Sequence, residues 1–209
     1  MRISCILYII AAMQMSCSII PTYPAGLPAL TQTDTNLELC PPIAGVYMDT
    51  GNAITPDGRL LGTVSLTRLL HPLTPESDSS KADTFIVQEG VERDLVEVES
   101  FKGQERLATW QQPKLTKEAY LSKGDRVSAD HYLCLNGYVR LVRDDEAGGG
   151  GTIGLVILTF KSDFLWLRKA VDGSLIVLHT FSDYVVINFV LPVGHGDKIW
   201  YQFQPAQTL

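Results

Sequence analysis

Charged side chains are scarce in this sequence. Only 19% of the 209 residues are Asp, Glu, Lys or Arg, whereas 45% are hydrophobic. The formal net charge is −6, and Lys and Arg form no run. Nucleic-acid binding needs a basic surface, so the composition argues against nucleic acid as a partner. Anionic membrane surfaces repel an acidic domain, so any membrane attachment must depend on something other than charge.

The usual signatures of catalysis and metal binding are also missing. The four histidines, His71, His131, His179 and His195, do not occur in a metal-binding spacing. There is no Gly-x-Ser-x-Gly motif for a serine nucleophile and no Cys-x-x-Cys motif for redox chemistry. We therefore predict a protein that is not an enzyme and that holds no cofactor and no metal.

The apolar run at the N-terminus is short. Ile3–Ala12 follows Arg2 and has the length of the hydrophobic core of a signal peptide. It falls short of the roughly 20 residues that a transmembrane helix needs. We predict a signal peptide over residues 1–16 and an exported protein. A retained transmembrane anchor is the alternative.

Cys17 follows this segment, in the sequence MSC at residues 15–17. These residues resemble the end of a bacterial lipobox, whose cysteine is acylated and becomes the first residue of the mature protein. Gln14 stands where leucine is usual. The alternative is cleavage before Ile19 by an ordinary signal peptidase, which prefers small residues near the cut. We favour lipidation of Cys17, and hence attachment to a membrane through an N-terminal lipid anchor.

Cysteines are few as well, with four in the chain. Cys5 leaves with the signal peptide, whereas Cys40 and Cys134 remain on either cleavage route. In an oxidising compartment these two can form a disulfide. The bond would close a loop of about ninety residues and stabilise the fold by roughly 4 kcal/mol. Two unpaired buried thiols are the alternative.

The chain divides into an N-terminal tether and one domain. Residues 17–39 contain three prolines and no hydrophobic period, which predicts a tether. The remaining residues, 40–209, are expected to form a single domain. Its leucines at 66, 69 and 70 have helical spacing and precede Pro72, so one short helix is expected near residues 60–71.

The rest of the domain has the pattern of short β-strands joined by turns. Asn136-Gly137 and Asp172-Gly173 are strong signals for two-residue hairpins. Gly148–Gly151 are expected to form a flexible hairpin tip. About nine or ten antiparallel strands around one core predict a mainly β domain, whose sheet closes into a barrel or a two-layer sandwich.

Aromatic residues are frequent in the C-terminal half, where core packing accounts for most such side chains. If the sheet closes around a gap, some of them would line an apolar pocket, the usual form of a small-ligand site. The candidate ligand-binding residues are Tyr47, Phe160, Trp166, Tyr184 and Trp200.

Four short stretches resemble a family of small, uncharacterised Gram-negative lipoproteins. They are CPPIAGVY at residues 40–47, YLCLNG at 132–137, DGSL at 172–175 and WYQF at 200–203. The resemblance implies an envelope lipoprotein with a disulfide. Ser18, which follows the anchor cysteine, implies delivery to the outer membrane.

A second resemblance, at the level of the fold, is to the lipocalins. Gly45-Val46-Tyr47 is similar to their Gly-x-Trp opening, with tyrosine in place of tryptophan. Ser182-Asp183-Tyr184 is similar to their Thr-Asp-Tyr motif. This resemblance implies a β-barrel carrier of a small apolar ligand.

These features predict an exported envelope lipoprotein with a non-catalytic binding or structural role, and a lipocalin-like carrier is the alternative. The protein is expected at the outer membrane of a bacterium, facing the periplasm or the cell surface. A soluble periplasmic or secreted protein is the alternative location. The expected partners are the membrane, through the lipid on Cys17, and either another envelope protein or a small apolar ligand.

Overall fold

The computed structural model describes residues 22–31, 40–70, 82–90, 95–115, 131–152, 155–187 and 193–206, and the predicted signal peptide and Cys17 lie outside them. The described residues form a mainly antiparallel β fold, as predicted, with one short helix. No helix among them is long and apolar enough to cross a bilayer. The elements are β1 (Gly45–Ile54), β2 (Leu60–Ser65), α2 (Leu66–Leu70), β3 (Thr84–Gly90), β4 (Leu95–Lys102), β5 (Glu105–Pro113), β6 (Tyr132–Leu135), β7 (Tyr138–Thr152), β8 (Leu155–Lys169), β9 (Leu175–Ile187) and β10 (Val193–Pro205).

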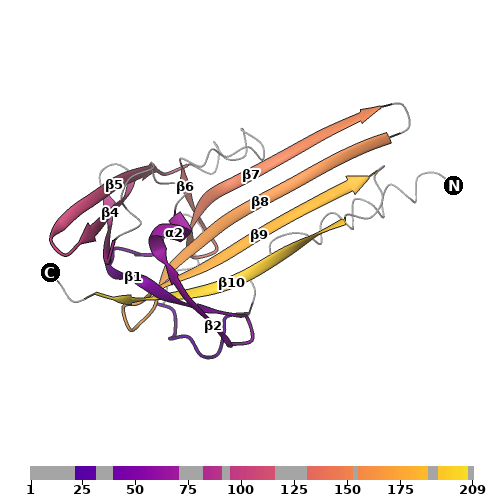
Figure 1. Cartoon of the computed structure of the whole chain (residues 1–209). Coiled ribbons are helices and arrows are strands. Elements are labelled where there is room, and N and C mark those ends of the chain that lie inside the picture. The colour runs from indigo at the N-terminus through magenta and orange to yellow at the C-terminus, as the bar shows by residue number, and fades with distance from the viewer. Residues whose placement is uncertain are drawn as a thin grey trace.

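All strands belong to one sheet, with the order β5-β4-β3-β1-β10-β9-β8-β7-β6, and β2 pairs with the second half of β1 (Figure 1). The expected closure into a barrel or a two-layer sandwich is wrong, because this single sheet is not closed. Within the described residues, an isolated bridge between Lys114 and Tyr132 joins the ends of the two outermost strands. Pro113 ends β5 and has no N–H to extend a ladder. Since β6 has only four residues, it presents few backbone groups with which β5 could form a ladder.

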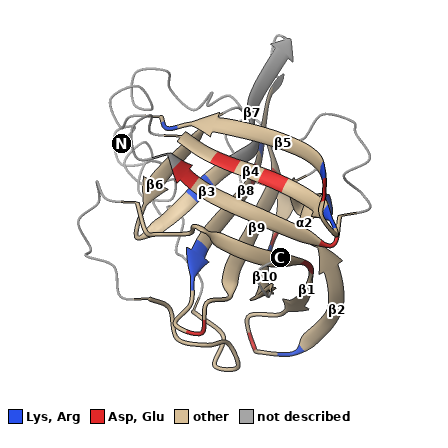
Figure 2. Cartoon of the chain, turned by 90° about the vertical axis from the view of Figure 1, so that its left-hand side faces the viewer, with Lys and Arg blue, Asp and Glu red and all other residues tan. Residues whose placement is uncertain are grey.

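The sheet nevertheless curls enough for its strands to share one core. Residues from nine of its strands and from α2 pack on the inner face, in the cluster Ile43, Tyr47, Leu66, Leu69, Leu70, Phe85, Val87, Val96, Val98, Trp110, Tyr132, Val139, Leu141, Leu165, Leu167, Leu175, Val177, Tyr201 and Phe203. Strand β4 follows the same alternation. Val96 and Val98 are buried, whereas Glu97 and Glu99, red in Figure 2, accept hydrogen bonds from side chains of β5.

A second cluster lies on the outer face, because successive side chains of a strand point to opposite faces. It contains Leu27, Tyr138, Trp166, Ala170, Ile176, Leu178 and Trp200. Leu27 belongs to residues 22–31, which lie within the predicted tether and pack here against the sheet. Val171 N–H donates to Ala29 O, and Thr31 N–H donates to Lys169 O. This part of the predicted tether is therefore folded onto the domain.

The helix is shorter than expected. The first half of the predicted range is strand β2, whose residues pair with Thr50–Ile54 of β1. Helix α2 begins at Leu66, where the Ser65 hydroxyl accepts a hydrogen bond from Arg68 N–H and caps the first turn. Buried Asp49 of β1 accepts two more bonds, from the backbone N–H and the hydroxyl of Thr67. The leucines with helical spacing, at 66, 69 and 70, therefore lie in α2, whereas the residues before them pair with β1.

Both hairpin predictions agree with the structure. Asn136 and Gly137 have positive φ angles of 54° and 73°, which a type I′ turn requires, and they join β6 to β7. Gly173, with a φ of 86°, lies in the turn between β8 and β9. Gly148–Gly151, in contrast, are not a hairpin tip. They are part of β7 and pair with residues 156–159 of β8, because a neighbouring strand satisfies backbone groups whatever the side chain.

Strands β7 to β10 are the longest in the fold, with 13 to 15 residues each. They project together beyond the curled part of the sheet (Figure 1). We call their projecting ends the arm, which consists of residues 144–152, 155–163, 181–187 and 193–197. The arm starts at one register level, where Asp144, Asp163, Phe181 and Asp197 are neighbours across the four strands.

Candidate functional site

The five predicted ligand-binding residues do not lie together. Tyr47 is buried in the inner cluster, whereas Trp166 and Trp200 are buried in the outer one. Phe160 and Tyr184 are exposed register partners in the arm. The five side chains therefore lie in three different surroundings, on both faces of the sheet.

Tyr47 has a structural environment. Its hydroxyl donates a hydrogen bond of 2.6 Å to Ile43 O, and the side chain is fully buried. Burial, and to a smaller extent the charge of Glu89, raise the pKa of the Tyr47 hydroxyl well above its usual value. Tyr47 is therefore neutral at physiological pH and fastens the chain at the start of β1.

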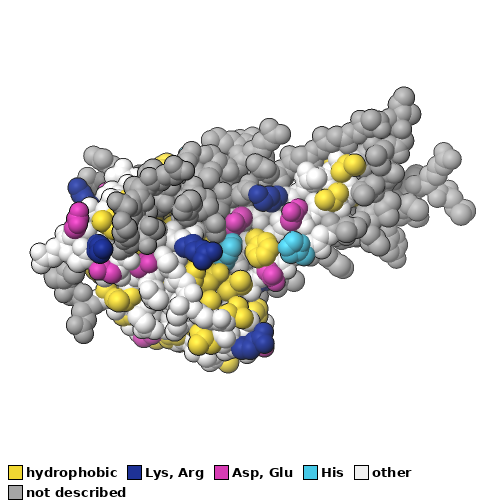
Figure 3. Space-filling model, in the orientation of Figure 1, with side chains coloured by type: hydrophobic (Ala, Val, Ile, Leu, Met, Phe, Trp, Pro, Cys, Tyr) yellow, Lys and Arg dark blue, Asp and Glu magenta, His cyan; other side chains and the backbone are white. Residues whose placement is uncertain are grey.

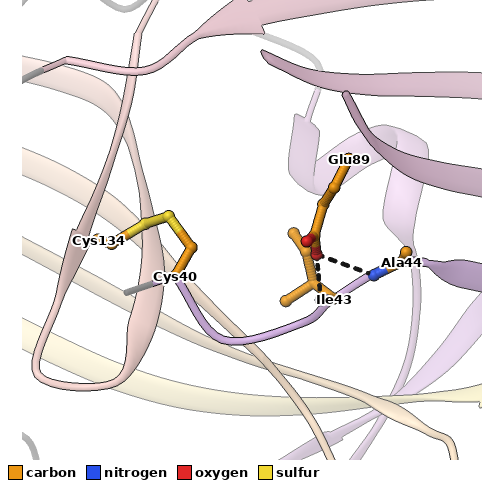
Figure 4. The surroundings of a disulfide bond; sticks show 5 residues. All are labelled: Cys40, Ile43, Ala44, Glu89 and Cys134. Atoms are coloured by element: carbon orange, nitrogen blue, oxygen red, sulfur yellow. Dashed lines mark hydrogen bonds between the residues drawn. A yellow bond between two sulfur atoms is a disulfide. The ribbon is translucent and has the colours of Figure 1, made fainter. Parts of the chain in front are cut away.

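A disulfide and a carboxylate hold the segment that leads into β1 (Figure 4). The structure is consistent with the predicted pairing: Cys40 and Cys134 form a disulfide, with their Cα atoms 5.1 Å apart. The Glu89 carboxylate accepts hydrogen bonds from Ile43 N–H and Ala44 N–H. These contacts join β6 and β3 to the same short segment, which is a structural role.

The arm carries a different arrangement at its base, a row of rings on the inner face. Tyr201, His179, Phe181 and His195 follow one another there, with successive ring centroids 6.5, 5.7 and 5.8 Å apart. We call these four side chains the ring row. Tyr201 and His195 come from β10, and the other two come from β9. Tyr201 is buried, His179 and Phe181 are half-buried, and His195 is exposed, so the row passes from the core into solvent.

A hydrogen bond orients the second ring of the row. His179 Nε2 and Asp163 Oδ1, on neighbouring strands, are 2.7 Å apart, and the carboxylate is the acceptor. Both side chains are mostly buried, which strengthens the bond relative to one in open water. The imidazole plane is therefore held in place between Phe181 and Tyr201.

Charged side chains surround the exposed end of the ring row. Asp183 is the register partner of His195, and Asp197 is the register partner of Phe181. Lys161 lies opposite Asp183 on β8. The side chains of Lys161, Asp183 and Asp197 are exposed. Figure 3 shows histidine, hydrophobic and acidic side chains gathered over this part of the sheet.

The side chains of the ring row determine what this arrangement can do chemically. Within the residues that the structure describes, no three His, Cys, Asp or Glu side chains come close enough together to hold a metal ion. The Asp163–His179 pair corresponds to two of the three members of a catalytic triad, but aromatic rings flank the imidazole. Rings with a fixed orientation and acidic neighbours can stack on a flat or apolar group and attract a cation.

The sequence contained part of the signal for this site. His179 and Phe181 are two residues apart in one strand, so they share a face. Asp163, His195 and Tyr201 come from other strands, and only the pairing register brings them to the same face. Searches of family models, curated proteins and solved structures find no match for this chain.

Proposed function

We propose that this chain is an exported envelope lipoprotein with a non-catalytic binding role, and that its ring row contacts another envelope protein. The observation that carries the proposal is the ring row itself. Half-buried Phe181 and exposed His195 stand on strands that project from the core, and a 5.8 Å ring contact joins them. Core packing does not require a histidine ring and a phenylalanine ring to meet edge to face at an exposed position.

The charges around the row indicate the character of the partner. Three carboxylates, those of Asp163, Asp183 and Asp197, lie beside or opposite the row on its own and neighbouring strands, and Lys161 is their nearest cation in the register. This arrangement favours a partner that presents a cationic side chain next to an apolar one. A basic segment of another envelope protein has this chemistry.

The alternative, a lipocalin-like carrier of a small apolar ligand, has less support. The inner positions where cargo would lie are filled by large side chains, such as those of Tyr47, Phe85 and Phe203. The leucines of α2 pack against the same cluster. A carrier needs an apolar cavity, and these residues instead make a packed core.

The lipid anchor predicts a specific labelling result. Replacing Cys17 with serine in the producing bacterium should abolish incorporation of radiolabelled palmitate, because the acyl acceptor is gone. Cys5→Ser is the matched control, since Cys5 lies inside the predicted signal peptide and should leave labelling unchanged. Label that persists in the Cys17→Ser chain, or its absence from the unsubstituted chain, contradicts the anchor.

The ring row predicts a site-specific contact in cells. A photo-crosslinking phenylalanine analogue at position 181 should give a product of higher mass with an envelope protein. The same analogue at Leu61, exposed by 50% on β2, serves as the control and should not give that product. His195→Ala should reduce the yield from position 181, because His195 forms the exposed end of the row. Equal products from both positions, or none from position 181, contradict the proposal.

A further inference from the structure

Charged residues stop at one level of the arm. Glu146, Lys161, Asp183 and His195 are register partners across β7, β8, β9 and β10. We call these four register positions the charged rank, because three of the four residues are an acid or a lysine. Beyond this rank, the described parts of the arm contain no Asp, Glu, Lys or Arg.

The next register level carries two exposed rings. Phe160 and Tyr184 are direct partners on β8 and β9, and their exposed fractions are 41% and 36%. Small residues flank the pair, since Ala147 lies opposite Phe160 and Gly194 lies opposite Tyr184. We call Phe160 and Tyr184 the aromatic pair. The Tyr184 side chain leans along the sheet, with its hydroxyl next to Gly196 of β10.

Beyond the aromatic pair, the side chains that the structure describes on β8 and β9 are apolar except for exposed Thr159, the register partner of Val185. Leu158 pairs with Val186, and Ile157 pairs with Ile187. Because consecutive residues of a strand point to opposite faces, Ile157 and Leu158 supply apolar side chains to both sides of the sheet. An antiparallel sheet at a protein surface usually has one polar face. The end of this arm therefore suits surroundings that are apolar on both sides.

We propose that the end of the arm inserts into a lipid surface, with the aromatic pair at the boundary and the charged rank in water. The order of charge, aromatic ring and aliphatic side chain follows the axis of the arm. This order matches the depth profile of a membrane interface, where aromatic side chains lie between polar headgroups and hydrocarbon. The inference rests on the proposed function, in which a lipid on Cys17 keeps the chain beside a membrane.

Charge and geometry limit the kind of contact. The net charge of −6 gives anionic lipid no attraction for the chain, so apolar burial must drive the insertion. Six residues of β8, Leu155–Phe160, extend beyond the charged rank. At about 3.3 Å per residue they cover roughly 20 Å, which is less than the hydrocarbon core of about 30 Å. The arm therefore reaches into one leaflet without crossing.

The open edges of the arm also favour a shallow position. Strand β6 pairs with β7 only over Tyr138–Leu141, and β1 pairs with β10 only from Trp200 onward. Among the described strands, none pairs with the outer edges of the arm. The backbone groups at these edges need water or headgroups, because unpaired groups are costly in hydrocarbon. The interface supplies both kinds of partner.

A tryptophan reporter tests this inference in the full chain. Phe160→Trp should lose emission strongly when the chain is reconstituted into vesicles of brominated phosphatidylcholine, and added salt should not reverse the loss. The native tryptophans at 110, 166 and 200 are buried, so they contribute little to the change. Leu61→Trp is the matched control on β2, and its emission should stay unchanged. Adding Tyr184→Glu to Phe160→Trp should weaken the quenching, with a roughly tenfold or larger loss of partitioning for one lost aromatic contact.

The outcomes separate this inference from the proposed function. If the chain stays with the vesicles but the tryptophan at position 160 is not quenched, the arm does not insert and the lipid anchor stands. If the emission of the tryptophan at position 160 changes with protein concentration in the absence of lipid, and brominated lipid does not quench it, the apolar end contacts a second copy of the chain. That result overturns the inference. If the Cys17→Ser chain floats with vesicles and position 160 is quenched, the arm inserts and the anchor is not required. A chain that does not associate with vesicles contradicts both proposals.

Discussion

Replacing Cys40 and Cys134 with serine should lower the free energy of unfolding by roughly 4 kcal/mol. The two residues are 94 positions apart, so the disulfide restricts a long loop of the unfolded chain. In the sheet order four strands separate β1 from β6, so the bond also joins distant parts of the folded sheet. Denaturation in urea measures the loss as a lower midpoint, and reductant added to the unsubstituted protein should reproduce it.

Glu89→Gln provides a matched comparison at the same segment. Glu89 accepts the hydrogen bonds of Ile43 N–H and Ala44 N–H, so removing its charge should cost about 1–3 kcal/mol, less than the disulfide. The two changes should not be additive, because both release the chain between Cys40 and Ala44. Equal stability of the oxidised and reduced proteins would show that the disulfide does not support the fold.

Local features of this fold could be predicted from the sequence. The hairpin at Asn136-Gly137 follows from two residues that tolerate positive φ, and the alternation of β4 follows from its residue pattern. The disulfide follows from counting the cysteines that remain after export. Each of these features depends on a few residues or on simple arithmetic, and none requires knowledge of which strands are neighbours.

Features that depend on distant partners could not be predicted in the same way. Leu60–Ser65 pairs with β1, although the expected helix begins near residue 60. Gly148–Gly151 are a strand because β8 lies beside them. Closure of the sheet depends on whether β5 and β6 can form a ladder, and no local pattern reports this.

The candidate site shows the same limit. The five candidate aromatic residues share a residue type that suits a ligand site, but their faces depend on strand register. Trp166 lies between Leu165 and Leu167 in sequence, yet its ring is on the outer face and the two leucine side chains are on the inner one. The ring row combines residues of β9 and β10, so it becomes visible only once the strands are paired.

Replacing Trp200 with alanine should destabilise the protein by about 3–5 kcal/mol, because the side chain is fully buried in the outer cluster. Its ring meets the edge of Tyr23 at a centroid distance of 5.2 Å, so the substitution also removes a support of residues 22–31. Hydrogen exchange should therefore accelerate at Val171 N–H, which donates to Ala29 O. Exposed Leu61→Ala is the control, with an expected change within about 0.5 kcal/mol. If Trp200→Ala lowers stability but leaves that amide protected, the outer cluster does not hold residues 22–31, and their backbone bonds to the β8–β9 turn suffice.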